Sequence, residues 1–265
     1  MTHNSFTQLR PTSPGQRFTS LLKRNNLLKI KRLKSKCSPN KIISGRNHSG
    51  QITSYHRGGG VKHSYRILDI NHKESNGLIE GYEYDPNRKA NINRLFNPDN
   101  HSHNYVLGVK DLDTGKVLRA FKNAKLKNGH SINLNSIPKG YVVHNVSSAE
   151  NKKGQYLRSS GAYGQLVQKA KGYGTIKLIS GELKNFPLNA SASIGRVCCE
   201  DHKLINYGKA GRKRWLGFRP KVRGVAINPV DHPHGGGEGR TSGGRPSVTP
   251  WGKPTKGQPT VKKKL

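Results

Sequence analysis

Two histidines and two carboxylates lie close together in the segment DHPHGGGEG, at His232, His234, Asp231 and Glu238. Imidazole and carboxylate groups can ligate zinc and transfer protons, so this group could serve a metal-dependent hydrolase. No third ligand with recognisable spacing follows, and the surrounding Gly- and Pro-rich backbone would not hold ligands rigidly. Neutral histidine also donates and accepts hydrogen bonds, which suits contacts with 2′-hydroxyl and phosphate groups. We therefore favour RNA contact over metal catalysis at these residues.

A second group of chemically capable residues fills the stretch from Gly45 to Arg66, GRNHSGQITSYHRGGGVKHSYR. Cations there can meet phosphates, rings can stack on unpaired bases, and glycines let backbone N–H groups approach oxygen atoms. The stretch does not match a nucleotide-binding P-loop, because no Gly-Lys-Ser/Thr follows at the required spacing. The alternative is a flexible glycine linker with solvated charge. We predict nucleic-acid contacts at Arg46, His56, Arg57, Gly58, Gly59, Gly60, Lys62 and Arg66.

The sequence Asp85-Pro86-Asn87-Arg88 resembles a functional acidic and basic pair. A turn between two strands explains Asp, Pro and Asn without any chemistry, so we interpret it as a turn and keep Arg88 as a phosphate contact. Trp215 and Trp251 could stack on bases. For Trp215 a small hydrophobic anchor is the stronger interpretation, because Leu216 and Phe218 adjoin it.

The charge of the chain indicates a polyanionic partner. Its 48 Lys and Arg residues face 14 Asp and Glu residues, giving a net charge of +34 and a pI near 10.5. Residues 1–60 hold 12 basic and no acidic residues, and residues 203–265 hold 15 basic and two acidic ones. The sequence therefore predicts a folded centre with two extended basic arms that seek nucleic acid.

The segment 228–254, NPVDHPHGGGEGRTSGGRPSVTPWGKP, is rich in Gly and Pro and offers almost nothing to bury. We expect it to take its shape from an outside surface, because it cannot offset the entropy of ordering. All but one of the other predicted nucleic-acid contacts lie in the C-terminal arm, residues 202–265. They are Arg158, Lys209, Arg212, Arg214, Trp215, Arg219, Arg223, Asn228, His232, His234, Gly235, Gly236, Gly237, Arg240, Arg245, Trp251, Lys253 and Lys256.

Composition excludes several classes of protein. No segment approaches the roughly 18 apolar residues of a membrane-spanning helix. Hydrophobic content of 31% predicts a small core confined to the middle of the chain. Cys37, Cys198 and Cys199 form an odd set without Cys-x-x-Cys spacing, so we expect reduced thiols and neither a disulfide framework nor a structural zinc site.

The middle of the chain reads as short β-type runs separated by turn residues. Two groups of five or six such runs predict an all-β fold of two small tandem barrels with basic irregular extensions. The only predicted helix is short and covers residues 208–216. The runs are 61–70, 78–84, 91–96, 103–109 and 116–121, then 130–134, 141–146, 163–170, 175–180, 183–188 and 193–199. The predicted domains are 1–60 and 202–265 for the extensions and 61–126 and 127–201 for the barrels.

Several motifs in one order resemble the family of the universal ribosomal protein numbered two of the large subunit. They span nearly the full length, and the last two are specific enough alone. The matching stretches are TSPGQR (12–17), GRNHSGQITSYHRGGGVKHSYRILD (45–69), EYDPNRKANI (83–92), HNV (144–146), GQYLRSSGAYGQLV (154–167), GKAGRKRWLGFRPKVRGVAINPVDHPHGGGEGR (208–240) and TPWGKPTKG (249–257).

The resemblance implies an oligonucleotide-binding-type (OB-like) barrel followed by an SH3-like barrel, with both termini threaded into large-subunit rRNA. It also implies a structural role near the peptidyl-transferase centre, in subunit association and in tRNA placement. The implied partners are rRNA, neighbouring ribosomal proteins and the small subunit, with no small-molecule substrate. No cofactor is implied, although structural magnesium shared with rRNA stays open. The loop matching 230–239 reaches towards catalytic RNA in this family, yet nothing here supplies an oriented base, so we predict no enzyme.

The chain departs from the family pattern at Lys152-Lys153, at Tyr156 and in a tail that stops at Leu265, where bacterial members usually continue. Its ending TSGGRPSVTPWGKPTKG is similar to members from mitochondria and their bacterial relatives. We therefore predict the mitochondrial matrix, with the bacterial cytoplasm or a plastid as alternatives. The competing function is a nucleic-acid-compacting protein without sequence preference.

Overall fold

A computed structural model describes residues 6–24, 27–71, 76–121 and 124–257. By internal contacts the chain divides into two units, each built from segments that are far apart in the sequence. Unit 1 consists of residues 1–42 and 61–212, and unit 2 consists of residues 43–60 and 213–265. Nearly all regular structure lies in unit 1, so its strands are described first.

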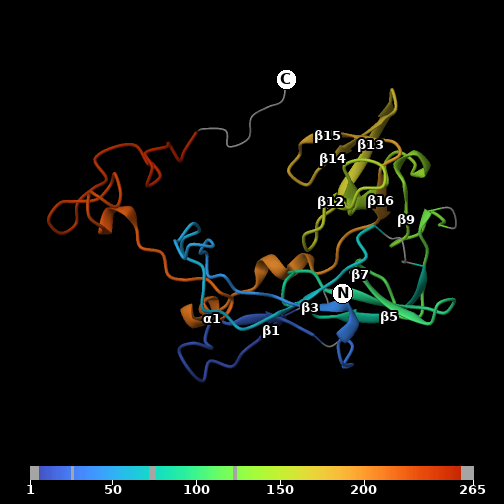
Figure 1. Cartoon of the computed structure of the whole chain (residues 1–265), viewed down its shortest axis with the longest axis horizontal. Coiled ribbons are helices and arrows are strands. Elements are labelled where there is room, and N and C mark those ends of the chain that lie inside the picture. Colours follow the sequence, from blue (N-terminus) through green and yellow to red (C-terminus); the bar gives the residue numbers. More distant parts are fainter. Residues whose placement is uncertain (1–5, 25–26, 72–75, 122–123, 258–265) are drawn as a thin grey trace. The chain divides into compact units, whose positions relative to one another are not determined.

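The first sheet of unit 1 is antiparallel and has the strand order β7-β6-β5-β8 (Figure 1). Side chains of β5 alternate between buried and less buried, as expected of a strand with one face on a core. Its register with β6 shifts between Ile79 and Gly81. A Cβ added at Gly81 would lie 2.7 Å from the Leu28 side chain. Glycine thus permits a bulge that lets the N-terminal segment pass close to the strand. The strands are β5 (Gly77–Glu83), β6 (Ile92–Asn97), β7 (Ser102–Leu107) and β8 (Val117–Leu118).

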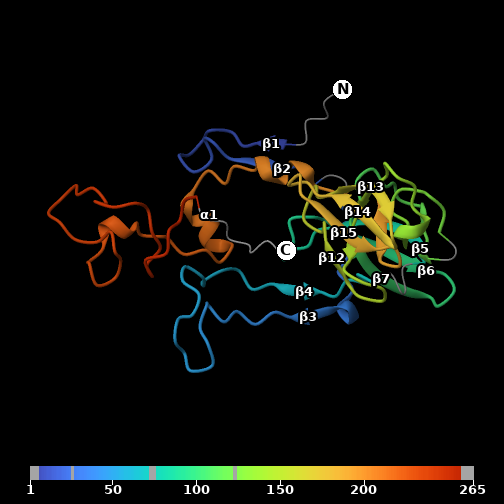
Figure 2. The same cartoon turned by 90° about the horizontal axis from the view of Figure 1, so that it is seen from above.

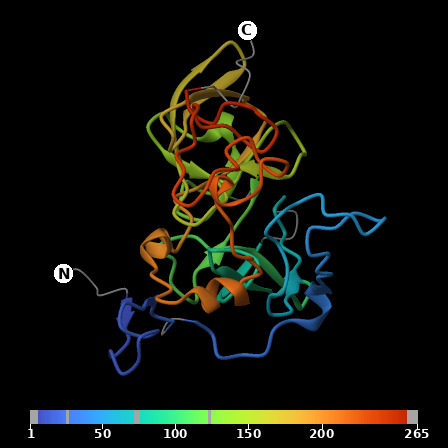
Figure 3. The ribbon, with the colours of Figure 1, turned by 90° about the vertical axis from the view of Figure 1, so that its left-hand side faces the viewer.

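The second sheet of unit 1 has six strands in the order β15-β14-β13-β10-β16-β9, and all neighbours are antiparallel. A separate pair, β11 with β12, lies in the same part of the sequence. In Figure 3 the strands of the first sheet are coloured teal to green and those of the second yellow-green to yellow. The strands are β9 (Ser131–Asn133), β10 (Val142–His144), β11 (Val146–Ser147), β12 (Gly154–Tyr156), β13 (Gly164–Ala170), β14 (Tyr173–Lys177), β15 (Leu183–Pro187) and β16 (Ser191–Ile194).

Two short strand pairs involve the N-terminal segment, which the sequence predicts to be extended. β1 (Phe6–Gln8) pairs with β2 (Ser20–Leu22), and β3 (Cys37–Pro39) pairs with β4 (Ser64–Arg66) (Figure 2). Ser20 also bridges to Asn206. The strand predicted over 61–70 is limited to β4, because its partner is only three residues long. Within the described residues of the predicted N-terminal extension, the named strands are thus limited to three residues each.

Buried apolar side chains form separate clusters under the two sheets. Ile79, Leu95 and Val106 lie under the first sheet, and Leu166, Ile176 and Phe186 lie under the second. A further cluster contains Tyr105, whose hydroxyl donates to Glu83 Oε2 at 2.7 Å and accepts from the Leu33 N–H at 2.9 Å. Burial raises the pKa of Tyr105, so its hydroxyl stays protonated and keeps this bridge.

Helical structure is scarce in the described residues. α1 (Ala210–Trp215) lies inside the predicted helix, and single 3-10 turns cover Lys34–Lys36, Leu134–Ser136, Glu200–Leu204 and Gly224–Ala226. The predicted all-β fold is confirmed. The assignment of the two sheets to OB-like and SH3-like barrels stays a prediction.

Truncation of a core side chain should be costly while its exposed neighbour should not matter. Leu166 is fully buried on β13, whereas the adjacent Val167 is 46% exposed. We expect Leu166→Ala to lower the free energy of unfolding by about 2–5 kcal/mol, because it leaves a cavity. Val167→Ala should change it by less than about 0.5 kcal/mol. Urea unfolding followed by circular dichroism measures both, and equal losses would refute this description of the core.

Candidate nucleic-acid interface

Unit 2 brings two predicted site segments together. Arg57 and Phe218 form an antiparallel bridge, the Gly58 N–H donates to the Gly217 carbonyl at 2.9 Å, and the Arg219 N–H donates to the His56 carbonyl at 3.0 Å. The predicted contacts at 56–60 and those at 214–219 therefore share one surface. Both segments are predicted from the sequence, and their pairing is seen only in the structure.

Side chains fix this joint from both segments. The Arg214 guanidinium donates from Nη1 to the carbonyls of Gly58 and Phe218, each at 3.1 Å. His56 Nδ1 lies 2.9 Å from the Pro220 carbonyl oxygen. Gly60 lies so close to the other segment that a Cβ would be 2.9 Å from the Gly217 nitrogen. We conclude that Arg214, His56 and Gly60 build the joint, in addition to any contact with a ligand.

The loop before the joint is shaped by one asparagine. Asn47 Oδ1 accepts from the Ser49 N–H at 3.1 Å and from the Gln51 N–H at 2.9 Å. Arg46 and Ile52 form a bridge at its base. This hydrogen-bonded loop leaves the Arg46 side chain exposed.

The histidine pair has a structural use that the sequence does not reveal. The rings of His232 and His234 stack with centroids 5.0 Å apart. His234 Nε2 accepts from the Val248 N–H at 3.0 Å, its Nδ1 lies 3.3 Å from the Gly243 carbonyl oxygen, and its N–H donates to His232 Nδ1 at 3.0 Å. His234 thus links three parts of the segment, at residues 232, 243 and 248, by hydrogen bonds. The expectation that only an outside surface could order this segment misses these internal contacts.

The described residues contain no group of three or more His, Cys, Asp or Glu side chains placed to hold an ion. A search of the same residues for a helix long and apolar enough to cross a membrane finds none.

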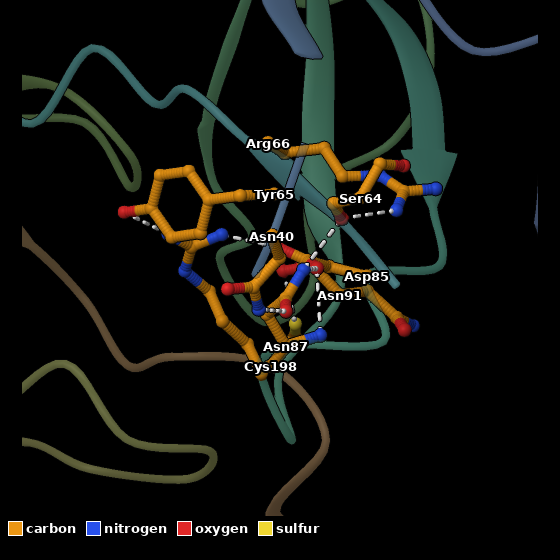
Figure 4. Close-up of polar contacts among 9 residues, drawn as sticks. Asn40, Ser64, Tyr65, Arg66, Asp85, Asn87, Asn91 and Cys198 are labelled. Carbon is orange, nitrogen blue, oxygen red and sulfur yellow. Dashed lines mark hydrogen bonds and ion pairs between the residues drawn. The ribbon is translucent and has the colours of Figure 1, made fainter. Parts of the chain in front are cut away.

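Asp85 organises the candidate contacts of unit 1 (Figure 4). Its buried carboxylate accepts from the Asn87 N–H at 2.8 Å and forms an ion pair with Arg88. Asn87 Nδ2 donates to the Ser64 carbonyl at 2.7 Å, which ties the turn to β4. The predicted turn is confirmed, and the acidic and basic pair that we set aside is also present, with a structural role.

Arg88 is held on an aromatic ring. Its guanidinium carbon lies 5.2 Å from the centroid of the Tyr65 ring, and Nη2 donates to the Tyr65 hydroxyl at 3.1 Å. Arg158 donates to the Gly154 carbonyl at 3.1 Å. Burial, with a smaller effect of the Arg88 charge, lowers the pKa of Arg158. An anion bound near these two guanidinium groups would relieve that repulsion.

A basic pocket of about 420 Å³ lies beside the β3 and β4 pair. Four cationic or imidazole side chains contribute to its wall, and Lys62 is the one among them that the sequence predicts as a contact. The basic run KIKRLKSK at 29–36 carried the signal for two of the others. The lining residues are Arg32, Lys34, Cys37, Ser38, Pro39, Lys62, His63 and Ser64.

Many predicted contacts in unit 2 are exposed and unneutralised. Arg57, Arg219 and Arg240 are exposed, and no salt bridge among the described residues involves them. The same exposure is found at Arg223, Arg245, Trp251, Lys253 and Lys256. The Asn228 backbone carbonyl accepts hydrogen bonds from the Asp231 and His232 N–H groups. Asn228 therefore lies in the turn that precedes Gly235, Gly236 and Gly237. Such side chains can neutralise phosphates without first breaking an internal ion pair.

α1 carries the remaining predicted contacts. Arg212 lies within it, Lys209 precedes it, and Trp215 ends it. Trp215 is 53% exposed, and Leu216 and Phe218 are exposed as well. The interpretation of Trp215 as a small hydrophobic anchor stays a prediction.

Two family models match this chain. The model described as Ribosomal Proteins L2, RNA binding N-terminal domain, matches residues 33–120, and Ribosomal Proteins L2, C-terminal domain, matches residues 127–252. Among similar proteins, "Large ribosomal subunit protein uL2" of Rickettsia akari is 48% identical over 256 residues, or 96% of this chain and 93% of that protein. The proteins of that name from Rickettsia typhi and Rickettsia prowazekii are each 47% identical with the same coverage.

A methyl group at Gly60 should loosen the joint in unit 2. We expect Gly60→Ala to speed amide hydrogen exchange at Gly58 and Arg219 about tenfold, as the two segments must move apart. Gly211→Ala is the matched control, because its Cβ would meet open space. Hydrogen exchange followed by NMR measures both variants. Unchanged exchange in Gly60→Ala would show that the two segments are not packed as described.

Proposed function

The chain belongs to the ribosomal protein L2 family, and from this premise we propose how it engages its ribosome. It is a structural constituent of the large ribosomal subunit that binds rRNA, and it is not an enzyme. Its partners are rRNA and other ribosomal proteins. The proposal concerns which surfaces make the contacts and where in the particle they lie.

The unit 2 joint and the segment after it form the main rRNA-binding surface of this proposal. The supporting observation is that exposed Arg57, Arg219 and Arg240 lack carboxylate partners in the described residues while the backbone around them is fixed by hydrogen bonds. A fixed backbone reduces the entropy lost on binding, and free cations supply counterion release. The other residues predicted from the sequence belong to this set.

The β3 and β4 pair of unit 1 provides the second surface. Arg88 on the Tyr65 ring, Arg158 and the basic pocket beside Lys62 offer cations next to aromatic and hydroxyl groups, a combination suited to phosphate and ribose. We add Arg32, Lys34 and His63 to the proposed contacts on the basis of the pocket. The four-part division into 1–60, 61–126, 127–201 and 202–265 is proposed as an arrangement of two barrels between two rRNA-binding extensions.

We place the His232 and His234 segment near the peptidyl-transferase centre, and the protein at a contact with the small subunit that supports subunit association. The family resemblance of the segment 208–240 supports both placements. His232 would pack against RNA there, without a chemical step. Any magnesium at this surface would be shared with rRNA.

The large subunit that contains this protein is proposed to lie in the mitochondrial matrix, on the resemblance of the ending TSGGRPSVTPWGKPTKG to mitochondrial members. The relatives reported above are bacterial, so the bacterial cytoplasm is the alternative. Fractionation of a eukaryotic source followed by a density gradient distinguishes them. Sedimentation with mitochondrial large subunits supports the proposal, and absence of the protein from mitochondria overturns it.

Removal of one unpaired cation should weaken rRNA binding without affecting the fold. We expect Arg240→Ala to lower affinity for large-subunit rRNA and to reduce the slope of log affinity against log salt by about 1. The wild-type affinity should fall by about 10³ to 10⁵ between 50 and 200 mM salt if about 6 to 10 phosphates are neutralised. Filter binding measures both quantities.

Lys177→Ala on β14 is the control, because that exposed lysine lies outside the proposed surface. It should leave affinity nearly unchanged. If the wild type bound any duplex as tightly as folded rRNA, the protein would instead be a general nucleic-acid-compacting protein. A response to salt that is flat would contradict phosphate neutralisation altogether.

A further inference from the structure

Two adjacent cysteines follow β16 within unit 1, in a segment whose backbone is held on both sides. The Cys198 N–H donates to the Gly108 carbonyl at 3.0 Å, and the Cys198 carbonyl accepts from the Gly161 N–H at 3.1 Å. The preceding residue, Val197, forms a bridge with Val109. The pair is therefore part of the packed structure and cannot be regarded as a loose tail.

The two thiols differ in their surroundings. Cys198 is buried in the cluster that contains Ile92 and Tyr105, and its sulfur lies 3.6 Å from the Asn91 carbonyl oxygen (Figure 4). Cys199 is partly exposed. A small oxidant can thus reach Cys199 more readily than the buried Cys198.

The backbone at Cys199 holds the sulfurs together. Cys199 has φ of 60° and ψ of 43°, in the left-handed region that a residue with a Cβ rarely adopts. In this conformation the two sulfur atoms lie 3.7 Å apart. A disulfide needs about 2.05 Å, so closure requires side-chain rotation and a modest backbone adjustment.

Their acidities also differ. The hydrogen bond between the two thiols lowers the pKa of Cys199, against the opposing effect of burial. The pKa of Cys198 is raised by its hydrogen bond with Cys199 and by burial. Thiolate is the form that attacks an oxidant, which makes Cys199 the nucleophile of the pair.

We propose that Cys198 and Cys199 form a thiol modification site, a dithiol that hydrogen peroxide converts to a vicinal disulfide. The Cys199 thiolate attacks one peroxide oxygen, the O–O bond breaks, and sulfenic acid and hydroxide form, the latter taking a proton to become water. The Cys198 sulfur then attacks the sulfenic sulfur as its thiol proton leaves with the hydroxyl group as water. The peroxide is reduced by two electrons, and the two thiols are oxidised to one disulfide.

The product should be easily reduced again. Adjacent Cα atoms are about 3.8 Å apart across a trans peptide, below the roughly 4.4–6.8 Å usual for disulfides. Strained disulfides have more oxidising potentials and are the labile ones. The site therefore acts as a reversible modification. It does not act as a structural crosslink.

Peptide mapping of the full-length protein tests the proposal. Reduced protein is treated with equimolar hydrogen peroxide, alkylated and digested with trypsin, which cuts after Arg196 and Lys203 and releases both cysteines in one peptide. We expect this peptide to escape alkylation and to lose the mass of two hydrogens. Dithiothreitol added before alkylation should restore its full alkylation. Cys37 should remain alkylated, as it lies outside the pair.

Single substitutions give matched controls. Cys37→Ser should behave like the wild type, and Cys199→Ser should react at least tenfold more slowly at position 198. Cys198→Ser should stop at an oxygen adduct on Cys199, which a sulfenic-acid reagent traps. Gain of oxygen without loss of hydrogen in the wild type, or reaction of Cys37 at the rate of the pair, would overturn the proposal. Neither result depends on rRNA binding.

Discussion

The excess of positive charge governs where this chain can be compact. A net charge of +34 with 31% hydrophobic residues leaves apolar material for a core only in the centre. In the described residues of unit 2, Val248 is the one buried hydrophobic side chain. Unit 2 must therefore hold its shape by backbone and side-chain hydrogen bonds, which are individually weak, while its cations repel one another. A bound polyanion would neutralise these cations and so stabilise the compact form of unit 2, as a hydrophobic core does in other domains.

Unit 2 meets this constraint by close backbone approach. Gly58 and Gly60 bring residues of one segment into hydrogen-bonding distance of Gly217 and Arg219, and Arg214 caps carbonyls from both sides. His234 performs a similar task in the later segment, where both ring nitrogens bind backbone groups. These contacts place the cations before any ligand arrives, which lowers the entropy that binding must overcome.

The sequence predicted the central strands well because turn chemistry is local. Asn and Asp with Pro or Gly bound β5, β6 and β7, and each strand lies within a residue or two of its expected range. It missed β1, β2 and β3, which are three residues long and have no alternating pattern. Lys62 was predicted as a contact because it follows three glycines. Arg32 and Lys34 line the same pocket only because β3 pairs with β4.

The sequence by itself determined the family, the nearly all-β fold and the choice of RNA as partner, because composition, turn residues and motif order are readable along the chain. Only the tertiary structure decided which basic residues share a surface, that Asp85 fixes Arg88, and that the Cys198 and Cys199 sulfurs lie 3.7 Å apart. The reason is physical: local propensity acts between near neighbours in sequence, whereas a surface or a reactive pair depends on backbone pairing and side-chain geometry that exist only after folding.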